Sequence, residues 1–512
     1  MGARLLHRLP QCAAELHQHL PRQPRQLGLR GREPRRLSAA VQVTISSHPE
    51  SPAARRLLLV GIVCLVTVVA IESMAISTVM PLVERDLGDL WLYGWTFSAF
   101  FIGDLLGIVV GGRSADRVHP IVPLLIGLGI FTVGLVVGGL APTMPVLILG
   151  RFLQGIGAGV GPAVAYVCVA RGFPPEDRPR VFAIMSTAWV VPSLVAPLVA
   201  SAVAETVGWR WVFLGLVPVT VLAAGLAAVS IRGVSGDPAE VHEALPLTRV
   251  AMLVVGCTAL LAGLSAGSPI AVVGGVACGL GLGLPALGRL LPAGAARAEP
   301  GLPAAVLIRG VLTFAFFSAS VYVSLAMTTV RNTSTFVAGA ALAIGSLTWT
   351  VGAWIQARRY ALWGPARLER LAGVVLVAGN LLMPLALFDA VPVVLWFVAT
   401  AVAGLGMGLG YAPLSSVALA GAEPGREGEA SSSLQLNDVL GIALGTGVGG
   451  AIVGLGDRLG ADLLTPLAGL FALSTLAAAV VACLAGRLTA ETSEGHSGVS
   501  GARSAAVPSN RS

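Results

Sequence analysis

Lysine is absent from this sequence, and charged residues of either sign are scarce. All 33 basic residues are arginine, and charged residues make up 12% of the 512 residues against 55% hydrophobic residues. Soluble domains carry about twice that charged fraction, so the composition excludes an ordinary globular protein. The formal net charge of +7 lies largely before Pro52 and in short loops, and it does not indicate nucleic-acid binding. We therefore expect an integral membrane protein.

Motifs for catalysis and metal binding are also missing. The six cysteines are scattered without CxxC spacing, which is typical of small buried hydrophobic residues. The sequence contains no HExxH, GxSxG or Walker A motif, so it indicates neither an enzyme nor direct use of ATP. We expect no catalytic residues, no metal site and no cofactor.

Fourteen apolar runs approach the ~20 residues needed to cross a bilayer. In order they are 57–80, 91–112, 121–140, 146–170, 181–204, 211–231, 250–266, 269–288, 306–330, 336–357, 370–388, 391–416, 432–455 and 463–486. Residues 1–55, rich in arginine and proline, and residues 488–512, rich in small polar residues, predict disordered tails. Residues 1–55 would also be explained if the start codon had been assigned too far upstream.

The arginine distribution predicts the orientation in the membrane. If the amino terminus is inside, most arginines between spans fall in cytoplasmic loops. The opposite loops then contain only Arg85, Arg210, Arg331 and Arg458. The positive-inside rule therefore predicts a multi-pass plasma-membrane protein with both termini in the cytoplasm.

Two runs of alternating glycines lie about half a chain apart. The first glycine ladder is Gly155, Gly157, Gly159 and Gly161, and the second is Gly404, Gly406, Gly408 and Gly410. Small residues let membrane helices approach closely, and no strand precedes either ladder, as a nucleotide-binding loop would require. Matching the ladders pairs the fourth span with the twelfth. This predicts an all-α membrane protein with two six-helix bundles related by an internal repeat, 56–231 and 303–487, and two central helices within 232–302.

Four local motifs carry a family resemblance. They are ESMAISTVMP from Glu72 to Pro81, GGRSADR from Gly111 to Arg117, LILGRFLQGIGAG from Leu147 to Gly159, and WRWVF from Trp209 to Phe213. Over about residues 57–486 the chain resembles the major facilitator superfamily, specifically its fourteen-helix drug:proton antiporter branch. The resemblance implies alternating access of two halves, and it implies that Gly112, Asp116 and Arg117 form a cytoplasmic gating loop.

The sequence departs from this family pattern in two places. His119, Pro120 and Ile121 replace the later glycine and the basic cluster of the loop motif. In the fifth span, Ala196-Pro197 and Ala200-Ser201 stand where the antiporter motif has glycine-proline and a glycine pair. The second departure keeps transport without antiport open as an alternative.

Charged residues inside the predicted spans are costly in hydrocarbon and are functional candidates. At a rise of ~1.5 Å per residue, Glu72 and Arg151 lie ~12 Å and ~8 Å from the outer face. We expect them to share a layer and to pair, unless each extends separately to the outer interface. Asp104 lies ~20 Å from that face. The resemblance implies that Asp438 approaches Asp104 across the central cavity, unless Asp438 only caps the thirteenth helix.

Polar neighbours extend the predicted coupling site. Gln154, Asn380 and Asn437 are assigned to the substrate cavity, whereas Arg309 opens the ninth span and is expected to anchor it at the inner interface. A helix amino terminus favours an anion. With the family resemblance supplying the pairing, we expect Asp116 to accept hydrogen bonds from the start of the thirteenth span, near Ser431 to Ser433, in the outward-facing state.

These features predict a secondary transporter that exports small hydrophobic or cationic compounds in exchange for protons. Its partners are the small-molecule substrate, protons and the lipid bilayer, and we expect a monomer. Glu72, Asp104, Arg151 and Asp438 are the predicted coupling residues. Two alternatives stay open: a metabolite uniporter or symporter of the same superfamily, and a non-transporting membrane sensor or lipid-handling protein.

Overall fold

The computed structural model describes residues 52–174, 177, 180, 181, 184, 185, 188–232, 247–423 and 426–488. Every regular element in this part of the chain is helical. The α-helices are α2 (Pro52–Leu87), α3 (Tyr93–Arg117), α4 (Ile121–Gly139), α5 (Met144–Gly172), α7 (Val190–Thr206), α8 (Arg210–Leu214), α9 (Leu216–Ile231), α10 (Leu247–Leu264), α11 (Pro269–Leu290), α12 (Leu302–Leu325), α13 (Thr335–Ala386), α14 (Val394–Ala420), α15 (Glu427–Arg458) and α16 (Leu464–Leu484). The predicted disordered tails lie almost wholly outside the described residues.

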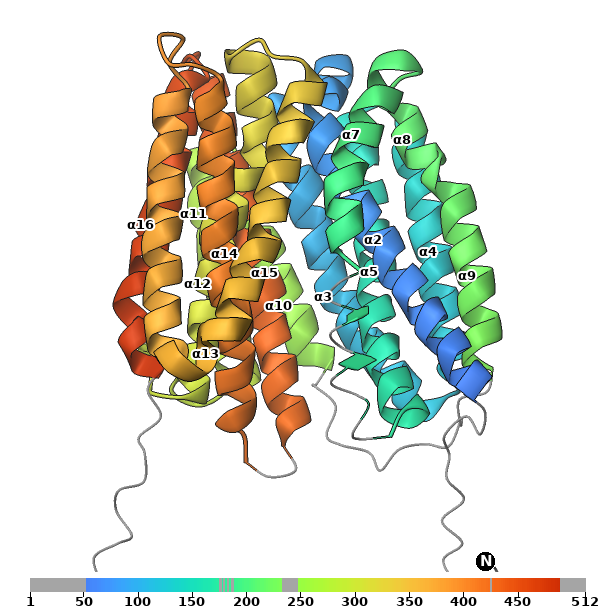
Figure 1. Ribbon diagram of the computed structural model, residues 1–512. Coiled ribbons are helices and arrows are strands. Elements are labelled where there is room, and N and C mark those ends of the chain that lie inside the picture. The colour runs from blue at the N-terminus through green and yellow to red at the C-terminus, as the bar shows by residue number, and fades with distance from the viewer. Residues whose placement is uncertain are drawn as a thin grey trace, which may run out of the picture. The chain divides into compact units, whose positions relative to one another are not determined.

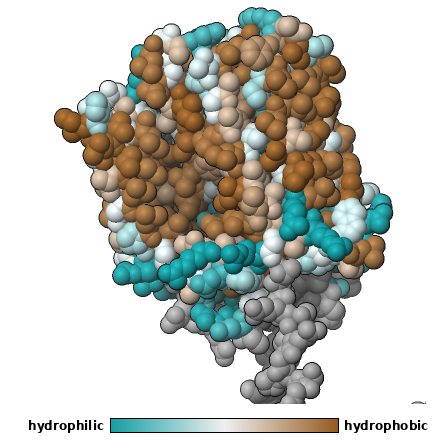
Figure 2. Space-filling view, turned by 90° about the vertical axis from the view of Figure 1, so that its left-hand side faces the viewer, coloured by the Kyte–Doolittle hydropathy of each residue, from teal (hydrophilic) through white to brown (hydrophobic). Residues whose placement is uncertain are grey.

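Twelve helices among the described residues are long and apolar enough to cross a membrane. The helices run side by side (Figure 1). Figure 2 shows a broad hydrophobic surface over their sides, with hydrophilic residues gathered toward the ends. Such a surface is expected where lipid is the solvent. The count takes α13 as one helix and leaves out α7, which has 17 residues.

Helix α13 joins two segments that the sequence predicts as separate spans, 336–357 and 370–388. Its 52 residues continue through the expected loop and are interrupted at Gly364, which has φ 67° and ψ 167°. Glycine tolerates this positive φ, and Pro365 has no N–H to donate to the preceding turn. We call Thr335–Trp363 the first arm of α13 and Pro365–Ala386 its second arm.

The two glycine ladders pack against neighbouring helices, as the sequence predicts. A Cβ atom on Gly155 would collide with the carbonyl group of Phe100 in α3, and one on Gly157 would collide with Gly127 and Phe131 in α4. The second ladder does the same: Gly404 meets Gly345 in the first arm of α13, and Gly406 lies against the second arm. Larger residues at these positions would push the helices apart.

The contacts of the two ladders share one register. The partners of Gly155 and Gly404 are Phe100 and Gly345, and the partners of Gly159 and Gly408 include Asp104 and Trp349. Each second-half partner lies 245 positions after its first-half counterpart, whereas the ladder glycines lie 249 positions apart. Partners of Gly157 and Gly406 obey the same rule, since Gly127 corresponds to Ala372 and Phe131 to Leu376. Helices α3, α4 and α5 are therefore packed like the two arms of α13 and α14.

Candidate functional site

A buried polar cluster lies between α2 and α5. Arg151 forms an ion pair with Glu72 through Nη1, and the same atom donates to Oε1 of Gln154. Its Nε donates to the carbonyl oxygen of Thr96 in α3 at 3.1 Å. Glu72 and Gln154 are fully buried, and Arg151 is 2% exposed. The expected pairing of Glu72 with Arg151 is thus present, and both side chains are buried within the protein.

Two polar atoms of this cluster lack hydrogen-bond partners in the part of the chain that the structure describes. The Arg151 guanidinium lies over the Phe100 ring, 4.5 Å from its centroid. Glu72 Oε2 and Gln154 Nε2 have no hydrogen-bond partner among the described residues. Burying charges costs several kcal/mol per ion, and the cost is offset only when the remaining polar atoms are paired. One carboxylate oxygen and one amide donor are therefore buried without a partner among the described residues, which is costly unless a proton or another group satisfies them.

Asp104 lies on α3 against the first glycine ladder. A Cβ atom on Gly159 would be 2.8 Å from its Oδ1, and the side chain is partly exposed. It makes no hydrogen bond or ion pair with the residues that the structure describes, but the Asp438 charge is close enough to act on it. Asp438 thus lies within electrostatic range of Asp104, while the approach of the two carboxylates across a central cavity, which the family resemblance implies, stays a prediction.

A second buried cluster surrounds Asp438. Arg309 Nε donates to Asp438 Oδ1 at 3.0 Å, and the Tyr411 hydroxyl donates to Oδ2 at 2.8 Å. Arg309 Nη1 also donates to the carbonyl oxygen of Tyr411, and its guanidinium lies over the Tyr411 ring. The prediction that Arg309 anchors the interface is wrong, because α12 begins at Leu302 and buries this side chain at 4% exposure. Asp438 lies well inside α15 and does not cap it.

Asn380 and Asn437, which the sequence assigns to the substrate cavity, instead form hydrogen bonds between helices. Asn437 Nδ2 donates to the carbonyl oxygen of Val306 at 2.6 Å. Asn380 Nδ2 donates to Ser474 Oγ at 2.6 Å and to the carbonyl oxygen of Ala315 at 3.3 Å. Both hold α12 against its neighbours. Neither lines the cavity described below.

The predicted gating loop is helical. Gly112, Asp116 and Arg117 belong to the last two turns of α3, which ends only at Arg117. The apolar run ends at Gly112, but the polar residues after it continue the same helix beyond the hydrocarbon. The Asp116 side chain lies outside the described residues, so its contact near Ser431 stays a prediction. Ser431 itself lies in the second turn of α15, which starts at Glu427.

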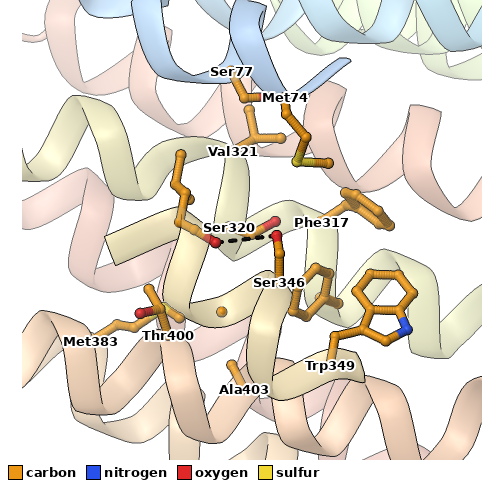
Figure 3. A pocket seen from close by; sticks show the side chains of 13 residues that line it. Met74, Ser77, Phe317, Ser320, Val321, Ser346, Trp349, Met383, Thr400 and Ala403 are labelled. Carbon is orange, nitrogen blue, oxygen red and sulfur yellow. Dashed lines mark hydrogen bonds between the residues drawn. The ribbon is translucent and has the colours of Figure 1, made fainter. Parts of the chain in front are cut away.

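A cavity of about 70 Å³ opens beside α12, α13 and α14, with Met74 and Ser77 contributed by α2 (Figure 3). Phe316 and Phe317 lie edge-on to Trp349, with ring centroids 5.4 and 6.5 Å away. None of the site residues predicted from the sequence lines it. Its lining comes from four helices and consists mainly of apolar and aromatic residues, which a single sequence does not distinguish from ordinary core.

By the shared register of the two ladders, the cavity lies at positions that correspond to the first cluster and to Asp104. Its lining residues Thr400 and Ala403 lie 249 positions after Arg151 and Gln154, and Trp349 lies 245 positions after Asp104. In this correspondence the guanidinium of Arg151 is matched by the hydroxyl of Thr400. The amide of Gln154 is matched by the methyl group of Ala403, and the carboxylate of Asp104 by the indole of Trp349. The two sets of helices that share this register therefore differ: α3 and α5 carry charged side chains where α13 and α14 line an apolar cavity.

Comparisons with known proteins agree with this architecture. A family model described as Major Facilitator Superfamily matches residues 62–446. An uncharacterized MFS-type transporter of Mycobacterium tuberculosis is 27% identical over 433 residues, covering 81% of this chain and 62% of the relative. This chain therefore spans less than two thirds of that relative's length.

Two further similarities are more limited. The multidrug transporter protein MdtP of Bacillus subtilis is 26% identical over 213 residues, which is 42% of this chain and 39% of that protein. A crystal structure of a POT family transporter in complex with a thioalcohol conjugated peptide gives a TM-score of 0.66 at 16% identity. It covers 87% of this chain and 100% of that chain. At this identity the likeness shows the fold alone.

Proposed function

Because this chain belongs to the Major Facilitator Superfamily, we propose that it is a secondary transporter that exports small hydrophobic or cationic compounds in exchange for protons. Transport proceeds by alternating access of two halves to a central site. The names of distant relatives, such as the multidrug transporter protein MdtP, support the choice of cargo.

The proposed architecture has fourteen spans. It counts the two arms of α13 separately and includes α7, whose 17 mainly apolar residues can cross a thin or locally deformed bilayer. The shared register of the two ladders supports duplicated halves, 56–231 and 303–487, with α10 and α11 inserted between them. The arginine distribution supports cytoplasmic termini, and the motif set supports the drug:proton antiporter branch.

The Glu72–Arg151–Gln154 cluster is the observation that carries the proposal. Glu72 is fully buried with one oxygen held by Arg151 and the other unpaired among the described residues. A carboxylate in this position can bind a proton or a cation on its free oxygen, but each reduces the attraction for the other. Competition of this kind couples an outward movement of cationic cargo to an inward movement of protons.

Asp104 supplies a second titratable group facing the other half. Its carboxyl group is partly exposed and makes no ion pair within the described structure. Repulsion from Asp438 disfavours two negative charges at once. A proton on Asp104 relieves this repulsion, so the proton load can change how the two halves approach each other.

The apolar cavity, at about 70 Å³, has room for part of a cargo molecule, and its lining supports cargo with a hydrophobic group. Aromatic side chains bind flat apolar groups over a large area and also attract cations through their ring faces. Trp349, Phe316 and Phe317 offer such faces, while Ser77 and Ser346 supply hydroxyl groups (Figure 3). In Figure 3 a dashed line marks the hydrogen bond that the Ser346 hydroxyl donates to the carbonyl oxygen of Leu342, one turn earlier in α13, at 3.2 Å.

Uniport or symport of a metabolite is the second candidate. It is favoured by the alanine and serine residues at positions 196, 200 and 201 of α7, which replace antiporter-motif glycines. These substitutions change helix packing without removing Glu72 or Asp104. The choice between exchange and uniport therefore needs a transport measurement.

Purified protein in liposomes tests both candidates. We expect an imposed proton gradient to drive a cationic dye against its concentration gradient, and Glu72→Gln to abolish this accumulation. The matched control is Asp462→Asn, which removes an exposed carboxylate after α15. Dye movement that is the same with and without the gradient would establish uniport instead. If neither a cationic dye nor a neutral analogue moves, the transporter proposal is wrong.

A further inference from the structure

Glu369 is a fully buried acidic residue that the proposed coupling site does not use. It lies near the start of the second arm of α13 and has no exposed surface. Neither of its carboxylate oxygens has a hydrogen-bond partner among the described residues. Its carboxyl group rests on Gly410 in α14, where a Cβ atom would be 3.1 Å from both oxygens.

Arg309 in α12 donates to the carbonyl oxygen of Tyr411, the residue that follows the glycine on which the Glu369 carboxyl group rests. Its positive charge therefore acts on Glu369. Arg309 is already bound to Asp438 of α15 and to the Tyr411 carbonyl of α14. Tyr166 of α5 also lies within electrostatic range of Arg309 and Asp438. One cation is therefore shared by two carboxyl groups, and in this arrangement Asp438 has the ion pair and the tyrosine hydrogen bond.

Burial without a partner decides the protonation of Glu369 here. An isolated carboxylate is far more costly in a low-dielectric interior than a neutral acid, because nothing replaces its lost hydration. The equivalent position in the first half supports the comparison: Leu124 lies 245 positions earlier in α4 and is also buried. The fold thus accepts an uncharged side chain at this site.

We propose that Glu369 is a proton-binding site of the second half and that Arg309 exchanges between Asp438 and Glu369. In the arrangement described, Glu369 holds a proton while Asp438 is ionised and paired with Arg309. When Arg309 turns to Glu369, Glu369 releases its proton to water and Asp438 takes one up from water. Each arrangement contains one cation, one carboxylate and one bound proton, so the cluster stays neutral throughout.

The role of this exchange rests on the proposed function: in a proton-coupled transporter it would give protons a second site, besides Glu72 and Asp104, from which to influence alternating access. Its physical content needs no substrate. Arg309 joins α12 to α14 and α15 in one arrangement and α12 to α13 in the other. Protonation of Asp438 therefore releases one inter-helix contact and forms another.

Infrared spectroscopy of the purified full-length protein in lipid, at neutral pH and without substrate, tests the proposal. We expect the carbonyl stretching band of neutral carboxyl groups to lose one group's intensity in Glu369→Gln and in Glu369→Leu. The exposed control Glu423→Gln should leave that band unchanged. Unchanged intensity in both Glu369 variants would overturn the proposal. The leucine variant guards against misfolding, because it restores the residue type found at position 124.

Asp438→Asn gives the sharper result. Without Asp438, Arg309 is free to pair with Glu369, so Glu369 should ionise. Because Asp104 also loses the repulsion of Asp438, the decisive comparison is with Asp438→Asn/Glu369→Gln, which should then remove no further intensity from the band. A purely structural Glu369 would keep its proton in this variant, which would overturn the exchange. Failure of dye transport in liposomes would refute the proposed function and leave these spectra unaffected, so the two failures are distinguishable.

Discussion

Thr400 occupies in α14 the position that Arg151 occupies in α5. Each lies four residues before the first glycine of its ladder, and the two ladders contact their neighbouring helices in the same register. Arg151 is held by Glu72, whereas the Thr400 hydroxyl donates to backbone carbonyls, including that of Ala341 at 3.0 Å. The same packing thus carries an ion pair in one half and an open cavity in the other.

The first prediction concerns the energetics of the buried pair. Removing one partner of such a pair costs about 3–5 kcal/mol, because the remaining charge is left uncompensated. We expect Arg151→Gln to lower the thermal unfolding temperature strongly, and the double variant Arg151→Gln/Glu72→Gln to recover most of the loss. Thermal unfolding in detergent measures both. Arg210→Gln is the control, because its ion pair with Asp86 is exposed and should contribute little. A double variant as unstable as the two single losses combined would contradict the pairing.

The sequence predicts the parts of this site that depend on helix geometry. Depth along the helix places Glu72 and Arg151 in one layer because both lie inside long apolar runs with clear outer ends. Alternating glycines predict close packing because a helix face without side chains lets a neighbouring backbone come near. Both inferences use only the rise per residue and the size of a side chain.

The cluster around Asp438 and the apolar cavity could not be predicted from the sequence and became visible only in the structure. Arg309 looks like the first residues of a span when the apolar run is counted from 306, but α12 starts earlier, at Leu302, and so buries it. Tyr411 and Glu369 could not be assigned to a site from the sequence, because their roles depend on contacts between helices that lie far apart in the chain. A single sequence shows which residues are apolar, but not which of them face each other across a gap.

The second prediction concerns the cavity. Ser346→Leu adds volume to a lining position, and overpacking of this kind costs about 1–3 kcal/mol. We expect the apparent affinity for a bulky aromatic cargo to fall by roughly tenfold, equivalent to ~1.4 kcal/mol, with proton dependence retained. Concentration-dependent dye transport in liposomes measures it. Ser416→Leu, at an exposed position of α14, is the control. Equal affinities in the two variants would exclude this cavity from cargo binding.

The third prediction tests alternating access where α3 meets α15. Gly94 packs against the Gly450 backbone and the Tyr322 hydroxyl, so a Cβ atom has no room there. We expect Gly94→Leu to act as a wedge between the halves and to expose buried positions on that side to a water-soluble reagent. Labelling of a cysteine introduced at Ser98, which contacts Thr446 at 3.0 Å, reports the opening.

The control for the wedge is Gly129→Leu. Nothing lies within 4 Å of the Cβ position at Gly129, so the larger side chain should be accommodated without moving a helix. Labelling at Ser98 should then match that of the parent protein. Equal labelling in the Gly94 and Gly129 variants would show that the α3–α15 contact does not control access.

The fourth prediction compares the last glycine of each ladder. A methyl group on Gly410 would lie 3.1 Å from both Glu369 oxygens, whereas one on Gly161 would make ordinary contact with Leu65 at 3.5 Å. Alanine is a better helix former than glycine by up to ~1 kcal/mol. We therefore expect Gly161→Ala to raise the thermal unfolding temperature slightly. Gly410→Ala should gain less or lose stability, and it should shift the carbonyl stretching band of neutral Glu369 by pressing on its carboxyl group. The same shift in both variants, or in neither, would show that Gly410 does not shape the Glu369 site.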